Sequence, residues 1–288
     1  MAKIDLSGSV VAITGGARGI GLAIAQALSA QGARVAIGDI DADLAAKAAA
    51  PLGVHAARLD VRERESFAAF LDSTRGALGP VDVLINNAGI MPMGPFLDET
   101  PAISAAQIGI NLGGVIHGMQ LALPAMLEQG RGHIVNIASL AGRFAIPGAA
   151  VYTATKFAVV GLTEAAAAEY RGRGVHFSAI LPSKVRTELA SGTERAGRGI
   201  PAVDAADVAA AVLHTLRRPQ LFVTVPGYLQ PAAAPYQLVP GWLSGLGRRV
   251  IRDDRILSRL DRGERAAYEQ RLAGLVPKPA PRKRAASA

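Results

Sequence analysis

The 288-residue sequence contains no cysteine. This absence excludes disulfide frameworks, catalysis by a thiolate, and the zinc and iron–sulfur sites that cysteine builds. The five histidines are scattered along the chain without the spacing of metal ligands; they are His55, His117, His133, His176 and His214. We therefore expect no metal centre.

Long hydrophobic runs are missing as well. No segment offers about 18 uninterrupted apolar residues, so no transmembrane helix is predicted. The apolar run near the N-terminus breaks at Thr14 and Gly15, which makes it too short for the hydrophobic region of a secretory signal. These absences predict a soluble, cytoplasmic protein.

The net charge of the chain is unevenly placed, because basic residues are in clear excess only near the C-terminus. Residues 241–288 hold 12 Lys and Arg against 5 Asp and Glu, and the whole chain carries a net charge of +8. The tail at 276–288, rich in Pro, Ala and basic residues, is predicted to be disordered. Because the tail has no interleaved aromatic residues and no recognisable binding module, we predict no nucleic-acid partner.

The sequence does contain short apolar runs that alternate with Ala- and Leu-rich amphipathic stretches. The runs predict seven strands, at residues 10–14, 34–38, 54–61, 81–86, 133–139, 175–181 and 221–225. A long helix is expected around 103–129. Nearly continuous apolar strands joined by helices indicate a parallel sheet covered on both faces. We predict an α/β, Rossmann-type doubly wound fold with one seven-stranded parallel sheet and helices on both faces.

The chain shows no internal repeat and no clear domain linker. We expect a single domain over residues 1–275, with a core at about 5–226 and a C-terminal helical extension, or lid, at about 227–275. Residues 219–247 carry no charge and contain five prolines, too many for a regular central helix or strand. Residues 242–274 suggest two short amphipathic helices.

A glycine-rich loop, TGGARGIG at residues 14–21, directly follows the first strand and opens the first helix. Gly15, Gly19 and Gly21 allow a tight turn and a close approach of the backbone to a pyrophosphate, whose charge is favoured at a helix N-terminus. The strand, the helix and an acidic residue about 20 positions further on supply the context that this motif requires. The loop predicts a dinucleotide site.

Asp39 closes the second strand. A carboxylate there accepts hydrogen bonds from the adenosine ribose hydroxyls and repels a 2′-phosphate, which favours NAD. Arg18 within the loop acts in the opposite sense, because a guanidinium pairs with a phosphate. We give Asp39 more weight, since an acid at the strand end occupies the place of the phosphate, and predict NAD rather than NADP.

Tyr152 and Lys156, in VYTATKF, lie four residues apart and would meet on one helix face. Taken alone, such a pair is common on surfaces. Together with other motifs, however, it resembles the classical short-chain dehydrogenase/reductase (SDR) family. The resemblance rests on TGGARGIG (14–21), LDV (59–61), NNAG (86–89), GINLGG around Asn111, NIAS ending at Ser139, YTATK (152–156) and LPSKVRT (181–187).

The resemblance implies a catalytic set of Asn111, Ser139, Tyr152 and Lys156. Tyr152 would be the general acid and base, and Lys156 would lower the pKa of its phenol and hold the nicotinamide ribose. Ser139 would polarise the substrate oxygen, and Asn111 would support a water relay behind Lys156. From the residues alone, Ser139 also fits a helix cap or strand-end turn, and Asn111 also fits a helix kink.

The same resemblance implies the cofactor contacts. The matching positions are Gly15, Arg18, Gly19, Ile20, Gly21, Asp39, Asp60, Val61, Asn87, Ala88, Gly89, Tyr152, Lys156, Pro182, Val185 and Thr187. One position departs from the family, which commonly has Pro-Gly after the sixth strand where this chain has Pro182-Ser183. Serine lacks the conformational latitude of glycine.

The expected substrate pocket is mostly apolar, with walls from Met91, Leu140, Arg143, Phe144 and Leu189. Arg143 has two interpretations, as a ligand for an acidic group or as a partner in a surface salt bridge. The apolar walls favour a hydrophobic secondary alcohol or ketone, steroid-like or lipid-like, with hydride transfer to or from the nicotinamide cofactor.

Two alternatives remain open. The uncharged stretch at 219–247 beside four arginines, at 248, 249, 252 and 255, also suits contact with anionic lipid, as in a peripheral membrane-associated lipid reductase. A non-catalytic NAD-binding sensor or scaffold would have an incomplete catalytic set, so the complete set favours an enzyme. By resemblance, we expect a homodimer or homotetramer built on the helices of Asn111 and Tyr152.

Overall fold

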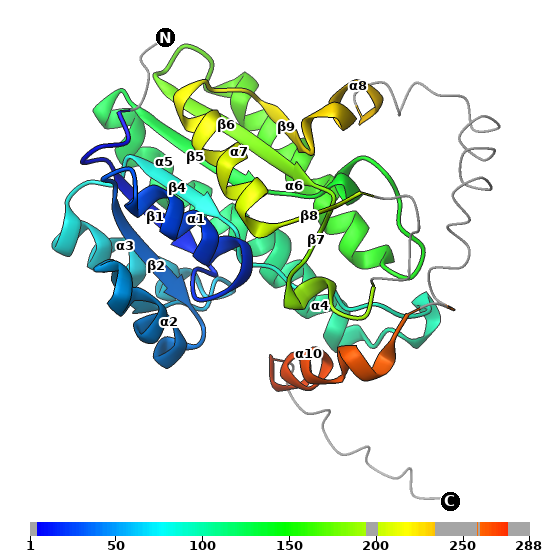
Figure 1. Ribbon diagram of the computed structural model, residues 1–288. Coiled ribbons are helices and arrows are strands. Elements are labelled where there is room, and N and C mark those ends of the chain that lie inside the picture. The colour runs from blue at the N-terminus through cyan, green and yellow to red at the C-terminus, as the bar shows by residue number, and fades with distance from the viewer. Residues whose placement is uncertain (1–4, 194–200, 234–257, 259, 276–288) are drawn as a thin grey trace, which may run out of the picture.

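The fold is a central parallel sheet between two layers of helices, as Figure 1 shows for the computed structural model. The structure describes residues 5–193, 201–233, 258 and 260–275. The seven strands of the main sheet are β1 (Val10–Thr14), β2 (Arg34–Asp39), β3 (His55–Arg58), β4 (Val83–Asn86), β5 (Gly132–Ile137), β6 (Val175–Pro182) and β9 (Phe222–Val225). The predicted seven-stranded parallel sheet is confirmed.

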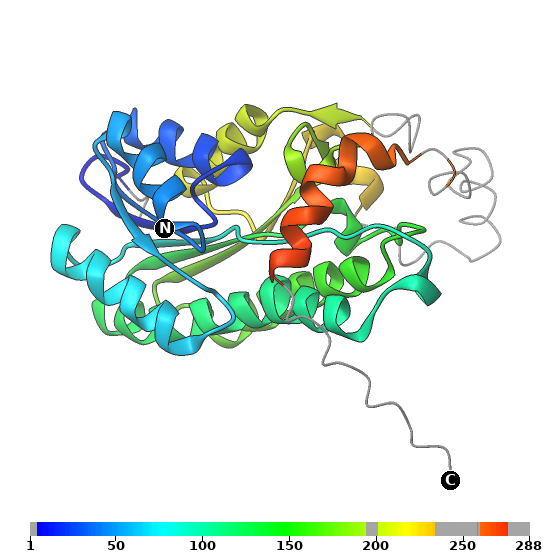
Figure 2. The same cartoon turned by 90° about the horizontal axis from the view of Figure 1, so that it is seen from below.

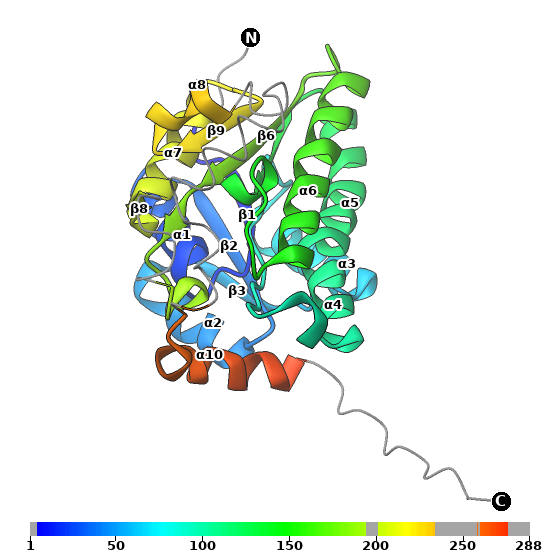
Figure 3. The same cartoon turned by 90° about the vertical axis from the view of Figure 1, so that its right-hand side faces the viewer.

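The helices divide between the two faces of the sheet, and Figure 3 shows the layers from the side. They are α1 (Gly19–Ser29), α2 (Ala42–Ala49), α3 (Arg64–Leu78), α4 (Pro101–Ile108), α5 (Gly114–Gln129), α6 (Ala150–Glu169), α7 (Ala205–Arg217), the four-residue α8 (Gln230–Ala233) and α10 (Arg262–Leu275). Helices α1, α2 and α7 share one core, and α3, α5 and α6 share the other.

Each central strand feeds both cores because successive side chains point to opposite faces. In β1, Val11 and Ile13 belong to the core under α1, whereas Ala12 belongs to the core under α3 and α5. All five residues of β1 are buried. Burial on both faces explains why the strands read as unbroken apolar runs rather than as alternating ones.

The strand order is β3-β2-β1-β4-β5-β6-β9. The chain therefore winds outward from β1 in one direction and from β4 in the other, and the order reverses between these two strands. In open α/β sheets, ligands bind at the carboxyl ends of the strands beside such a reversal. The topology places the candidate site there, next to the loops that follow β1 and β4.

Several strands and helices are shorter than predicted. The strand predicted at 54–61 ends at Arg58, so Leu59, Asp60 and Val61 lie in the loop beyond it. The long helix predicted around 103–129 is α4 and α5 joined by one π-helical turn, Gly109–Gly113. A short second sheet, β7 (Lys184–Val185) with β8 (Ala202–Val203), was not predicted.

The C-terminal extension is described only in part. One of the two amphipathic helices predicted over 242–274 is present as α10, while residues 234–257 and the tail at 276–288 lie outside the described residues. Figure 2 shows α10, in red and orange, crossing between the two helical layers. Its first turn is tied to Gly192 by a 2.9 Å hydrogen bond from the Asp261 amide.

Within the described residues, one continuous helical stretch, Pro101–Gln129, is long and apolar enough to span a membrane by length and composition. Half of its most apolar window is buried inside the protein. Val115, Met119 and Met126 from this stretch belong to the core beside the sheet, so the stretch also has the character of a core helix.

Candidate active site

The glycine-rich loop and the NNAG turn are locked together at the carboxyl ends of β1 and β4. The Thr14 hydroxyl accepts hydrogen bonds from the amides of Asn87 and Ala88, both at 3.0 Å. The Asn87 side-chain amide donates to the carbonyls of Thr14 and Gly15, at 2.9 and 3.0 Å. A Cβ atom at Gly21 would lie 2.2 Å from the Gly15 carbonyl oxygen. Only a glycine lets helix α1 start this close to the loop.

Asp39 is buried at the end of β2 and supports the same loop. Its carboxylate accepts hydrogen bonds from the Ala17 amide at 3.1 Å and from the Asp41 amide at 3.2 Å. Arg18 lies between two other carboxylates, at 3.2 Å from Asp41 and 3.6 Å from Glu188. Its guanidinium is thus already neutralised by acidic partners at the mouth of the site.

Asp60 and Val61 lie in the loop after β3. Arg62 grips the Asp60 carboxylate with Nε and Nη2, at 2.6 to 3.2 Å. This hydrogen bonding lowers the pKa of Asp60, against the opposing effect of burial. Arg62 also donates from Nη1 to the Leu275 carbonyl at 3.0 Å, so one side chain connects this loop to the end of α10.

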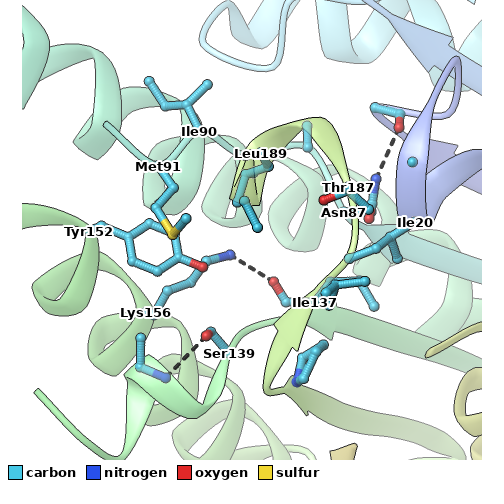
Figure 4. Close-up of a pocket in the computed structure, with 18 of the residues that line it drawn as sticks. Ile20, Asn87, Ile90, Met91, Ile137, Ser139, Tyr152, Lys156, Thr187 and Leu189 are labelled. Carbon is cyan, nitrogen blue, oxygen red and sulfur yellow. Dashed lines mark hydrogen bonds between the residues drawn. The ribbon is translucent and has the colours of Figure 1, made fainter. Parts of the chain in front are cut away.

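Helix α6 carries Tyr152 and Lys156 one turn apart, and both side chains are buried. The Lys156 ammonium donates to the Ile137 carbonyl at the end of β5, at 2.8 Å. Its nitrogen lies 5.7 Å from the centroid of the Tyr152 ring. Ser139 follows β5, and its hydroxyl accepts a hydrogen bond from the Ala141 amide at 3.0 Å. Figure 4 shows the three side chains grouped together.

Burial dominates the protonation of the pair. It raises the pKa of Tyr152 to about 12, although a hydrogen bond with Ser139 acts in the opposite direction. It lowers the pKa of Lys156 from 10.5 to about 8. The raised pKa of Tyr152 runs against the lowering expected from Lys156, and its cause is the burial of the phenol.

Asn111 lies in the π-helical turn between α4 and α5 and is almost completely buried. Its side chain accepts a hydrogen bond from the Ile90 amide at 2.8 Å and donates to the Ile90 carbonyl at 2.9 Å. It also donates to the Thr155 hydroxyl at 3.2 Å. Isolated π turns are frequent at functional sites. Here the turn directs the Asn111 side chain toward the loop after β4 and toward Thr155, which precedes Lys156 on α6.

A single cavity of about 890 Å³ connects these groups. The predicted residues that line it are Gly15, Arg18, Gly19, Ile20, Asp39, Asp60, Val61, Asn87, Ala88, Gly89, Met91, Ser139, Leu140, Phe144, Tyr152, Lys156, Pro182, Val185, Thr187 and Leu189. Figure 4 shows Thr187 and Leu189 facing the cavity from the loop after β7. Gly21 and Asn111 stand behind the wall, in supporting positions.

Arg143 does not line the cavity. Its guanidinium stacks on the ring of Phe222, 4.4 Å from the ring centroid, so its place as a pocket residue was wrong. A spacing argument missed this because Phe222 comes from β9, about 80 residues later in the chain. Ser183, the departure from the family pattern, does line the cavity, and its hydroxyl donates to the Pro201 carbonyl at 2.7 Å.

Four further lining residues come from α10 and were not predicted: Tyr268, Arg271, Leu272 and Leu275. The signal was in the sequence, because positions 268, 272 and 275 recur at helical spacing. The neighbouring sequence does not show which part of the protein this apolar helix face would cover. Arg271 pairs with Glu188, so α10 joins the acidic group that holds Arg18.

Among the described residues, no group of three or more His, Asp or Glu side chains is arranged to hold a metal ion. The cavity instead offers the features of a dinucleotide site. Gly15 and Gly19 adopt positive φ angles of 64° and 53°, and helix α1 presents its N-terminus to the cavity. A nicotinamide dinucleotide thus fits the residues present: the glycine-rich loop would hold its phosphates, and Asp39 would bind its adenosine ribose.

Comparison with known proteins gives a consistent result. A sequence model of the short chain dehydrogenase family matches residues 9–197. The 2-(S)-hydroxypropyl-CoM dehydrogenase 3 of Xanthobacter autotrophicus is 40% identical over 185 residues, which cover 62% of this chain and 72% of that protein. The 3-alpha-(or 20-beta)-hydroxysteroid dehydrogenase of Mycobacterium tuberculosis is 39% identical over 187 residues, covering 64% and 72%.

A solved structure shows the same fold with a cofactor. A short-chain dehydrogenase/reductase from Burkholderia phymatum in complex with NAD superposes with a TM-score of 0.73 at 27% identity. The match covers 80% of this chain and 93% of that protein. The fold therefore agrees with the sequence relationship.

The buried ammonium makes a prediction about stability and pH. Between about pH 8 and 10.5, the unfolded chain holds the Lys156 proton and the folded chain does not. The free energy of unfolding should therefore rise with pH in this window, by up to about 3 kcal/mol. Lys156→Met should remove this rise in urea titrations, and Lys47→Met, at an exposed lysine of α2, should keep it. Parallel curves for the wild type and Lys156→Met would contradict the assignment.

Proposed function

The chain belongs to the short-chain dehydrogenase family, and from this premise we propose that it interconverts a hydrophobic secondary alcohol and its ketone with NAD. Family membership itself implies an oxidoreductase that acts on CH–OH groups with a nicotinamide cofactor. The observation that carries the proposal is the convergence of Ser139, Tyr152 and Lys156 in one cavity with the glycine-rich loop.

The cofactor, when bound, accepts or supplies the hydride. The protein's own residues position the substrate and move the proton. The hydroxyls of Ser139 and Tyr152 bind the substrate oxygen. Because burial raises the pKa of Tyr152, the phenol keeps its proton and is suited to donate it to a developing alkoxide.

In the direction of alcohol oxidation, Tyr152 first loses its proton to solvent, and the phenolate then takes the proton of the substrate hydroxyl. Lys156 assists because its nitrogen is close to the Tyr152 ring, and a positive charge there favours the phenolate during proton transfer. Asn111 acts one step further away. It fixes the loop after β4 through both polar groups of Ile90 and so keeps one wall of the site in place.

The preference for NAD rests on charge. A 2′-phosphate beside Asp39 would meet a buried carboxylate. Arg18, the residue that would have favoured NADP, is held by Asp41 and Glu188. A phosphate would have to compete with these two carboxylates for the guanidinium. Both observations therefore support NAD.

The apolar character of the substrate follows from the walls near Tyr152. Those walls come from Met91, Met93, Leu140, Phe144, Ile146, Leu189 and Leu272. A related protein is named a hydroxysteroid dehydrogenase, which agrees with a bulky apolar substrate. The alternative of a non-catalytic NAD sensor is disfavoured because Asn111, Ser139, Tyr152 and Lys156 are all present in the sequence. The alternative of membrane contact was based on residues 219–247 and the four arginines that follow, and the part of this segment from residue 234 onward lies outside the described residues.

We also propose that residues up to 275 form one domain and that it associates with a second copy. In support of the domain, α10 is bonded to loops after β3, β4 and β7. In support of association, an apolar groove lies beside α4 and α6, lined by Phe96, Ile108, Leu112 and Val151 among others. Phe96 is 64% exposed and Ile108 is 50% exposed in the single chain.

Tyr152→Phe should lower kcat by about 10²- to 10⁴-fold, because it removes the proton donor and keeps the ring. The measurement is NADH formation with a panel of secondary alcohols. Tyr170→Phe, at the far end of the same helix α6, should retain activity. Equal rates for wild type and Tyr152→Phe would exclude the mechanism.

Asp39→Asn should reduce discrimination between the two cofactors. We expect wild-type kcat/KM to be at least about 10-fold higher with NAD than with NADP, and the ratio to fall about 10-fold in the variant, since one charge repulsion is lost. Asp43→Ala, an exposed acid in the first turn of α2, is the control. A wild type that prefers NADP would overturn the assignment.

Ile108→Asp should shift the protein to a smaller species in sedimentation velocity, because a charge in a desolvated apolar interface is costly. Tyr228→Asp, at another exposed large side chain, should leave the species unchanged. A wild type that sediments as a monomer at micromolar concentration would refute the association.

A further inference from the structure

Helix α10 brings a second tyrosine into the cavity. Tyr268 lines the same cavity as Tyr152 and Ser139, and only 6% of it is exposed. It lies 116 residues after Tyr152 in the sequence. It belongs to the C-terminal extension, which contains none of the motifs on which the family resemblance rests. Figure 2 shows its helix, α10, lying between the two helical layers.

Tyr268 is held by a rigid set of contacts. Its hydroxyl oxygen accepts a hydrogen bond from the Met91 amide at 2.8 Å. Arg265, which is completely buried, places its guanidinium 4.9 Å from the centroid of the Tyr268 ring. The guanidinium of Arg271 lies 5.7 Å from the same centroid.

Arg265 is itself anchored to the loops that surround the substrate region. Its guanidinium donates to the carbonyls of Ser191 at 2.9 Å, of Leu189 at 3.3 Å, and of Met91. The backbone of Met91 is thus bound at its amide by Tyr268 and at its carbonyl by Arg265. A buried arginine that donates to three carbonyls is a positioning residue, because moving it would leave a charge unpaired in an apolar interior.

The direction of the Tyr268 hydroxyl proton follows from these contacts. A phenol has one proton to donate, and here the oxygen already serves as the acceptor for an amide. Burial raises the pKa of Tyr268 to about 12, so the proton is kept at neutral pH. Tyr152, which lines the same cavity, adds a small contribution to this rise in the pKa of Tyr268.

We propose that Tyr268 determines substrate specificity by donating a hydrogen bond to a second oxygen of the substrate. The site would then prefer an apolar alcohol or ketone that carries a neighbouring hydroxyl or carbonyl group, such as a diol or a hydroxy ketone, over one that carries a single oxygen. The inference rests on the proposed function, because Tyr152 and Ser139 must take the first oxygen. It deepens that function by naming the substrate class.

The surroundings make a lone donor effective. The cavity walls next to Tyr268 are largely apolar, with Met91, Leu189 and Leu272 among them. A buried donor without a hydrogen-bond partner is costly, because it has given up its hydrogen bond to water and gained none in return. A substrate with only one oxygen would therefore leave the Tyr268 proton facing apolar side chains, and the penalty would appear as discrimination.

Tyr268→Phe tests the proposal because it removes the hydroxyl and preserves the ring that stacks on Arg265. The assay compares kcat/KM for cyclohexanol with kcat/KM for cyclohexane-1,2-diol, -1,3-diol and -1,4-diol. For at least one diol, the preference over cyclohexanol should fall about 3- to 10-fold in the variant. The value for cyclohexanol should fall less than the value for that diol. Tyr228→Phe, at an exposed tyrosine that does not line the cavity, should change neither.

A binding measurement separates this inference from the proposed function. The same four ligands are titrated into the NAD-loaded Tyr152→Phe protein, with and without Tyr268→Phe, so that no turnover is needed. A diol preference that depends on Tyr268 supports the specificity role even where wild type shows no activity, an outcome that would count against the proposed function alone. No diol preference in either protein, or an equal loss for cyclohexanol and every diol, would overturn the role of Tyr268.

Discussion

The Lys156 ammonium group lies out of water and donates to the Ile137 carbonyl at the end of β5. Burying an ammonium group is costly unless it is hydrogen-bonded, and this carbonyl is available only because β5 ends there. The ammonium group can therefore be buried only if β5 ends at this point and α6 brings Lys156 within reach of the carbonyl. The position of Tyr152, one turn earlier on α6, follows from the same contact.

The surrounding structure keeps that region closed to solvent. The loops after β1 and β4 are joined through Thr14 and Asn87, and Asn111 holds the next part of the β4 loop from behind. On the open side, α10 supplies the last wall and is fixed at both ends, by Gly192 near its start and by Arg62 at Leu275. Asn111 and the C-terminal extension thus bind neighbouring backbone residues, Ile90 and Met91.

Much of the fold and of the cofactor site could be predicted from the sequence because the determinants are local. The glycines of TGGARGIG, the acid at the end of β2 and the Tyr-Lys spacing on α6 carry their geometry with them. Arg143 failed because its partner, Phe222, is distant in the sequence. Tyr268 was missed for the same reason, since only packing shows which surface α10 covers. The raised pKa of Tyr152 was not predicted, because the spacing of Tyr152 and Lys156 shows that they are close but not that they are buried.

The central claim is that burial, more than the neighbouring charge, sets the protonation of Tyr152 in the free protein. Its most direct test is a difference titration of phenolate absorbance between wild type and Tyr152→Phe from neutral to alkaline pH. With a Tyr152 pKa of about 12, the two curves should coincide up to about pH 10. An additional phenolate in the wild type with a midpoint near neutral pH would contradict the account.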